Sequence, residues 1–158
     1  MLDKTKAEDS VISKKALLPI SIVIFGIAGD LAKRKLIPAL YQLIADGKLC
    51  HFAVVGVSVD KTTVQALLDQ AAKNIPKCKP SIMKTLRECF YYYQMDFYDS
   101  EAYLQLRDLI AIVEKKHKLN ANHLFHLATL PQHFDAITKN LAQHKIAQKH
   151  KTGLCEGQ

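Results

Sequence analysis

Residues 20–32 read ISIVIFGIAGDLA, a run of apolar residues followed at once by two glycines three positions apart. The run at 20–25 is rich in β-branched residues, which is typical of a strand buried on both faces of a sheet. From Leu31 onward apolar residues recur at helical spacing, with Gly47 as the expected stop. Pro38 is expected either to kink this helix or to break it early. A strand, a glycine turn and a helix in this order predict the opening of a parallel βαβ unit.

The alternation of strands and helices continues along the chain. Further strands are expected at residues 52–55, 91–97 and 123–129. Helices are expected to be capped by Thr62 or Thr63, by Ser81 and by Ser100, and a last one opens at Pro131 and ends near residue 143. No hairpin signal joins the strands, so the predicted fold class is α/β: a Rossmann-like, doubly wound, mainly parallel sheet with helices on both faces.

Composition limits the chain to one ordinary domain. Its 158 residues are 49% hydrophobic and 23% charged, too apolar for a disordered chain and too short for two domains. We expect a flexible lead-in at residues 1–18, a dinucleotide-binding domain at 19–145, and a polar tail or the start of a continuation at 146–158.

Charge, cysteine content and the two ends of the chain indicate the cellular location and the partners of the protein. The net charge of +7 indicates solvated ends or an affinity for anionic ligands, and no nucleic-acid-binding module accompanies it. The apolar runs are much shorter than the roughly 18 residues of a membrane span, and the polar N-terminus lacks the apolar core of a signal peptide. Four cysteines without a C-x-x-C pair indicate free thiols. We therefore expect a cytoplasmic protein with neither nucleic acid nor membrane as a partner.

The glycine turn has the residue types that a phosphate-binding loop needs. Gly26 lets the chain turn sharply out of the strand, and Gly29 lets backbone N–H groups approach a pyrophosphate. Ala32 keeps the helix close to the sheet, and the helix N-terminus adds partial positive charge. The alternatives are a tight turn that binds no ligand and, for Asp30, a helix cap without ligand contact.

The residues after the second strand bear on the choice of nicotinamide coenzyme. An acidic residue there binds the ribose 2′-hydroxyl of NAD, whereas a basic residue accommodates the 2′-phosphate of NADP. The stretch GVSVDK at 56–61 contains both kinds of residue. Asp60 favours NAD, and Ser58 with Lys61 can hold a 2′-phosphate, so both coenzymes stay open.

The seven histidines form no recognisable catalytic or metal-binding pattern. His123 and His126 lie three apart on an expected strand, so their side chains point to opposite faces of the sheet. We expect packed or solvated histidines, no metal site and no catalytic residue within this chain. The basic cluster at 33–35 is either solvated or reaches an anionic substrate.

Residues 25–40, FGIAGDLAKRKLIPAL, resemble the opening of glucose-6-phosphate dehydrogenases. Segments at 54–56, 93–97 and 125–140 resemble further parts of the same family. The resemblance implies NADP-linked oxidation of glucose 6-phosphate to 6-phosphogluconolactone, at the entry of the pentose phosphate pathway. By position it implies a lysine near the reacting centre at Lys35 and coenzyme contacts at Gly26, Ile27, Gly29, Asp30, Leu31, Ala128, Thr129 and Leu130.

Two departures from the family pattern bear on coenzyme choice and activity. Val59 stands where the family usually has an arginine beside the 2′-phosphate, so NADP is implied and NAD remains possible. The family motifs Glu-Lys-Pro-Phe-Gly and Arg-Ile-Asp-His-Tyr, the second of which carries the catalytic base, are absent and lie beyond residue 158 in full-length members. We therefore expect a truncated coenzyme-binding part that does not oxidise glucose 6-phosphate alone. The alternative is a non-catalytic, stand-alone nucleotide-binding or regulatory module.

Overall fold

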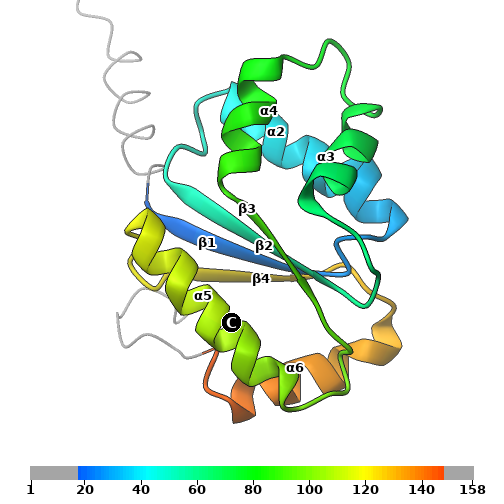
Figure 1. The fold of residues 1–158 in the computed structure, drawn as a ribbon, viewed down its shortest axis with the longest axis vertical. Coiled ribbons are helices and arrows are strands. Elements are labelled where there is room, and N and C mark those ends of the chain that lie inside the picture. The colour runs from blue at the N-terminus through cyan, green and yellow to red at the C-terminus, as the bar shows by residue number, and fades with distance from the viewer. Residues whose placement is uncertain (1–17, 148–158) are drawn as a thin grey trace, which may run out of the picture.

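A four-stranded parallel sheet forms the centre of the protein, seen in a computed structural model that describes residues 18–147 (Figure 1). The strand order is β3-β2-β1-β4, and every neighbouring pair is parallel. The bounds are Ile20–Phe25 for β1, Phe52–Ser58 for β2, Phe90–Gln94 for β3 and His123–Leu127 for β4. This arrangement confirms the predicted Rossmann-like α/β fold. Most of the expected lead-in and tail, residues 1–17 and 148–158, lies outside the described residues.

Helices cover both faces of the sheet, as Figure 1 shows. One face packs against α2 (Ile37–Ala45), α3 (Val64–Ala72) and α4 (Pro80–Glu88), and the other against α5 (Ala102–His117) and α6 (Phe134–Gln143). Side chains alternate along β1, with Ile22 and Ile24 in the first core and Val23 and Phe25 in the second. Because both faces are buried, the central strands are apolar almost throughout.

Of the kink and the early break expected at Pro38, the structure shows a distortion without a break: a π-helical turn, η1 (Ala32–Leu36), lies directly before α2. Proline has no backbone N–H, so Pro38 cannot donate to the carbonyl four residues earlier. The N–H of Ile37 instead donates to the carbonyl of Ala32, one residue further back than in an α-helix. The wider turn contains the basic cluster at 33–35. At the far end of α2, Gly47 adopts a φ of +68°, which confirms the expected stop.

The bounds of three strands differ from the expectation. β2 continues past Val55 through Gly56 to Ser58, because its parallel pairing with β1 and β3 extends to that point. β3 begins one residue early, at Phe90, and ends at Gln94, and β4 ends at Leu127. In the two edge strands the ends lack a second neighbour, so the chain leaves the sheet earlier than the apolar pattern predicts.

Of the expected helix caps, only the threonine is confirmed. The Thr63 hydroxyl accepts a hydrogen bond from the N–H of Ala66 at 3.1 Å. The predictions for Ser81 and Ser100 are wrong. Ser81 lies inside α4, which begins at Pro80 without a side-chain cap. The Ser100 hydroxyl lies 2.9 Å from Nε2 of His144, so a tertiary contact replaces the local one.

Candidate functional site

The loops that follow β1, β2 and β4 lie side by side at the carboxyl edge of the sheet. Phe25, the last residue of β1, pairs with Val57 on one side and with Leu127 on the other. Two hydrogen bonds continue this register into the loops: the Gly26 N–H donates to the Val57 carbonyl at 2.7 Å, and the Ala128 N–H donates to the Phe25 carbonyl at 2.8 Å. The edge therefore brings together the three segments in which the predicted coenzyme contacts lie.

Gly26 is required by the backbone itself. Its φ is +88°, and a Cβ there would lie 2.4 Å from the Ala128 carbonyl oxygen and 3.0 Å from Cγ2 of Thr129. Any side chain would therefore collide with the loop after β4. The neighbouring Ile27 is fully buried, and its N–H donates to the Val57 carbonyl at 3.3 Å. The buried side chain of Ile27 and the hydrogen bond of its N–H therefore both hold the turn against the sheet.

Gly29 is under a different constraint. A Cβ at this position would meet only the carbonyl oxygen of Gly26, at 3.2 Å, and its φ lies outside the left-handed region. The packing of the described residues would therefore tolerate a small side chain at this position after a slight shift. An absent side chain at this point leaves the loop backbone open to a phosphate group, which is the use that the pattern predicts.

The first helical turn after the loop is exposed and charged. The Asp30 carboxylate lies 3.0 Å from Nε of Arg34, and both side chains are largely exposed. Leu31, at the N-cap position, makes no side-chain capping bond. Lys35 is also exposed. Asp30 therefore forms an ion pair with the basic cluster, which moderates the positive charge beside the loop.

The end of β2 holds an acidic side chain in a defined place. The buried Ser58 hydroxyl donates to Oδ2 of Asp60 at 2.6 Å, and the Asp60 N–H returns a bond to the Ser58 oxygen at 3.3 Å. The Tyr92 hydroxyl on β3 reaches the carbonyls of both residues, and the Gln94 amide donates to the Val59 carbonyl at 3.0 Å. Burial raises the pKa of the Tyr92 phenol, a hydrogen bond with the Ser58 side chain opposes this rise, and the nearby Asp60 charge adds to it.

Exposed apolar side chains border the edge. Leu31, Val59 and Leu130 come from the three different loops and are exposed to 54%, 61% and 63% respectively. Apolar side chains on these loops can serve as walls of a small-molecule site, in which apolar surface flanks a few polar contacts. Both Lys61 and Thr129 lie in these loops, and the Thr129 hydroxyl bonds locally to the Leu130 carbonyl.

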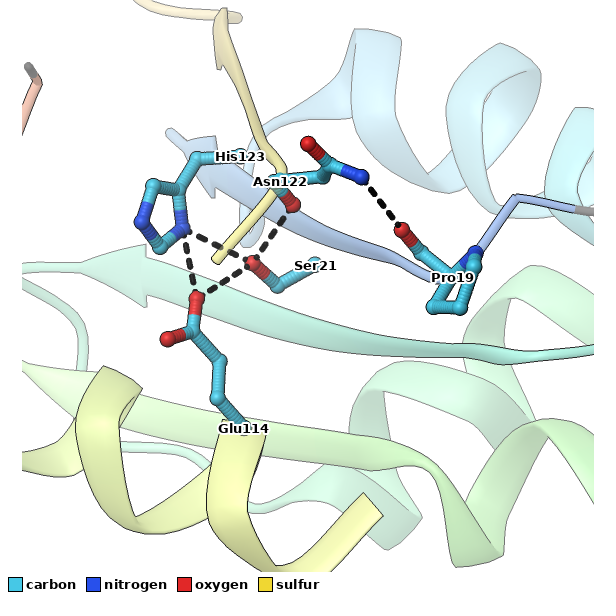
Figure 2. A network of polar contacts seen from close by, with 5 residues as sticks. All are labelled: Pro19, Ser21, Glu114, Asn122 and His123. Carbon is cyan, nitrogen blue, oxygen red and sulfur yellow. Dashed lines mark hydrogen bonds and ion pairs between the residues drawn. The ribbon is translucent and has the colours of Figure 1, made fainter. Parts of the chain in front are cut away.

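A polar network lies at the opposite, amino edge of the sheet (Figure 2). The Ser21 hydroxyl lies 3.0 Å from Oε1 of Glu114, 2.9 Å from Nδ1 of His123 and 3.2 Å from the Asn122 carbonyl. Glu114 and His123 are themselves 2.7 Å apart. Ser21 has no exposed surface, so no substrate reaches its hydroxyl, although serine, histidine and glutamate occur together. The network joins β1, β4 and α5 and has a structural role.

Histidines elsewhere also have partners within the protein. Nε2 of His117 lies 2.7 Å from the Tyr91 hydroxyl, and Nδ1 of His133 lies 2.8 Å from the Tyr98 hydroxyl. Among residues 18–147, no group of three or more His, Cys, Asp or Glu side chains is arranged to hold a metal ion. Over the same range, no helix has the length and apolar character needed to cross a membrane.

Two residues that position the edge were not singled out from the sequence. A Cβ at Gly56 would lie 2.8 Å from both γ carbons of Ile27, so this glycine makes room for the turn after β1. Tyr92 holds the loop after β2 from the neighbouring strand. The only available signals were a glycine inside an apolar run and a tyrosine on an edge strand, and neither indicates which loop it supports.

The parallel sheet, the glycine turn and the acid after β2 define a Rossmann-like dinucleotide-binding domain. The sequence profile described as "Glucose-6-phosphate dehydrogenase, NAD binding domain" matches residues 23–154. The chain therefore belongs to this family, which indicates a nicotinamide dinucleotide as its cofactor.

Similar proteins support the same assignment. The chain is 30% identical to glucose-6-phosphate 1-dehydrogenase of Chlamydia pneumoniae over 145 residues, and the alignment covers 88% of this chain and 28% of the relative. It is 36% identical to the Streptococcus pneumoniae enzyme over 136 residues, covering 80% of this chain and 26% of the relative. A solved glucose-6-phosphate dehydrogenase in complex with glucose 6-phosphate superposes with a TM-score of 0.74 at 25% identity, covering 81% of this chain and 28% of that one. The chain thus spans little more than a quarter of the length of these relatives.

Proposed function

We propose that this chain binds a nicotinamide dinucleotide across the carboxyl edge of its sheet, as the coenzyme-binding domain of a glucose-6-phosphate dehydrogenase. The observation that carries the proposal is the meeting of three loops at that edge, with a glycine turn that excludes side chains and a carboxylate held after β2.

Each loop has a separate task in this proposal. The backbone from Gly26 to Leu31 receives the pyrophosphate at the start of the helix, where N–H groups lack intrahelical partners. Ser58 to Lys61 faces the adenosine ribose. Ala128, Thr129 and Leu130 border the nicotinamide. Lys35 is proposed to lie toward the sugar substrate, as the family resemblance implies.

The complete reaction is proposed for a longer polypeptide. In that form, the bound dinucleotide would supply the acceptor for the hydride from C1 of glucose 6-phosphate, and the hydroxyl proton would go to a base outside these 158 residues. The reaction is proposed to occur in the cytoplasm, at the entry of the pentose phosphate pathway. The isolated chain holds coenzyme without turning over substrate.

A thermal-shift titration tests the binding step. Coenzyme at about 100 times its dissociation constant stabilises the folded state by about 2.7 kcal/mol. For a domain of this size that corresponds to a rise in melting temperature of roughly 5–10 °C. No rise at saturating NAD+ or NADP+ contradicts the proposal. Formation of NADPH from glucose 6-phosphate by the purified chain contradicts the placement of the base outside these 158 residues.

A second candidate function, a non-catalytic nucleotide-binding module, is favoured by one observation. Within the described residues, β4 pairs only with β1, so its other edge presents unpaired backbone groups, and Leu124 there is half exposed. A module of this kind is expected to bind coenzyme and also to remain active in regulation without any catalytic domain. Co-expression of the chain with a separate catalytic region of a glucose-6-phosphate dehydrogenase, in a strain that lacks this enzyme, separates the two. Restored oxidation of glucose 6-phosphate supports the coenzyme-binding domain of a dehydrogenase, and no restoration supports the non-catalytic module.

A further inference from the structure

We infer that Asp60 makes this domain select NAD+ over NADP+. The inference rests on the proposed function, because it concerns which of the two coenzymes the same edge accepts. It concerns the loop after β2, where the adenosine ribose of a dinucleotide lies in Rossmann-like domains.

The first ground is the fixed position of the Asp60 carboxylate. One oxygen accepts the Ser58 hydroxyl proton at 2.6 Å, and the backbone on either side is held from β3 by Tyr92 and Gln94. Asp60 itself is exposed at the edge. Its second oxygen is therefore available to accept a hydrogen bond from a ribose hydroxyl, at little cost in side-chain ordering.

The second ground is the lack of a compensating cation. Among residues 18–147, no lysine, arginine or histidine lies within ion-pair distance of Asp60. The residue before it, Val59, is apolar and 61% exposed. A 2′-phosphate carries a charge of about −1.5 to −2 at neutral pH, and it would lie against a carboxylate whose charge no ion pair neutralises.

The third ground concerns Ser58, the other residue expected to favour a 2′-phosphate. Its side chain is only 4% exposed, and its single hydroxyl proton is donated to Asp60. It therefore has no proton left to donate to a phosphate oxygen in this arrangement. Lys61 is exposed next to Asp60, and its positive charge attracts a 2′-phosphate. Selection of NAD+ therefore requires that the repulsion from the Asp60 carboxylate exceeds this attraction.

Calorimetric titration of the 158-residue chain with NAD+ and with NADP+, at physiological ionic strength, tests the inference. The wild-type chain is expected to bind NAD+ at least about tenfold more tightly than NADP+. The variant Asp60→Asn keeps an oxygen that accepts the Ser58 bond and removes the charge. We expect it to bind NADP+ more tightly than the wild type does and to narrow the preference to within about threefold.

Asp46→Asn is the matched control. Asp46 ends α2 at the opposite edge of the sheet, where it accepts a hydrogen bond from Gln42 at 2.9 Å, so the same change of charge is made far from the site. This variant is expected to leave the preference unchanged. Lys61→Ala is expected to lower the affinity for NADP+ only slightly.

The outcomes are separable. If the wild type binds NADP+ as tightly as NAD+, or more tightly, the inference is wrong while the proposed function stands. An unchanged preference in Asp60→Asn also overturns it and assigns selection to another group. If neither dinucleotide binds a chain that melts cooperatively, both the inference and the proposed function are wrong.

Discussion

Replacement of Gly26 by alanine tests whether the turn after β1 is built as the structure indicates. The new Cβ would lie 2.4 Å from the carbonyl oxygen and 2.8 Å from the carbonyl carbon of Ala128. These are backbone atoms, and the Ala128 N–H is itself bonded to the Phe25 carbonyl, so the neighbour cannot move aside cheaply. The positive φ of +88° adds a separate penalty for an alanine.

The two penalties can be estimated separately. A left-handed backbone costs a residue with a Cβ about 1–2 kcal/mol, and forcing atoms into a packed region costs about 1–3 kcal/mol. Together they predict a loss of roughly 3 kcal/mol in the free energy of unfolding. For a chain of this length the melting temperature is expected to fall by roughly 6–12 °C.

Gly47→Ala is the control for the backbone penalty. Gly47 also has a positive φ, +68°, but a Cβ there meets no atom within 4 Å. Its replacement is expected to cost only about 1 kcal/mol. Urea unfolding of both variants, followed by circular dichroism, gives the difference of about 2 kcal/mol that belongs to the collision. Equal losses in the two variants would refute the argument that the loop after β4 closes on Gly26.

Three further predictions are tested by measuring the free energy of unfolding and, for the glycine variant, the affinity for coenzyme. Gly29→Ala is expected to change the free energy of unfolding by less than about 1 kcal/mol yet to weaken coenzyme binding, and unaltered affinity would contradict the phosphate assignment. Glu114→Ala leaves Ser21 and His123 without their shared acceptor and is expected to cost about 2 kcal/mol, whereas a cost near zero would show that the network is not structural. Burial lowers the pKa of His117, and the charges of Lys116 and His51 lower it further. The unfolded chain therefore binds more protons than the folded chain, so the free energy of unfolding falls as the pH drops through the ordinary titration range of histidine. His117→Gln should flatten that pH dependence, and an unchanged slope would assign it to other groups.

The sequence predicted the elements and their order because those depend on local patterns. The apolar runs at 20–25 and 52–55 are long enough to indicate buried strands, and the helices between them indicate parallel pairing. The threonine cap of α3 was predicted because its bond joins residues three apart. The Ser100 cap failed because the Ser100 partner, His144, is 44 residues away, and the Ser81 cap failed because α4 begins one residue earlier, at Pro80.

The choice of coenzyme also depends on contacts that residue types alone do not reveal. Ser58, Asp60 and Lys61 were all recognised, yet the sequence left NAD and NADP open. The residue types alone do not say which group is engaged within the protein. In the structure the Ser58 hydroxyl donates its proton to Asp60. That contact is the basis for the inferred preference for NAD+.

By itself the sequence determined the strand–turn–helix opening at 20–36 and the family to which it points, because neighbouring residues carry both signals. Tertiary structure alone decided why Gly26 must be glycine, since the atoms it would strike belong to Ala128, about a hundred positions further on. It also decided that Gly56 makes room for Ile27 and that Ser21, Glu114 and His123 meet at the far edge. Parallel pairing brings these distant residues into contact, and no local pattern records which ones will meet.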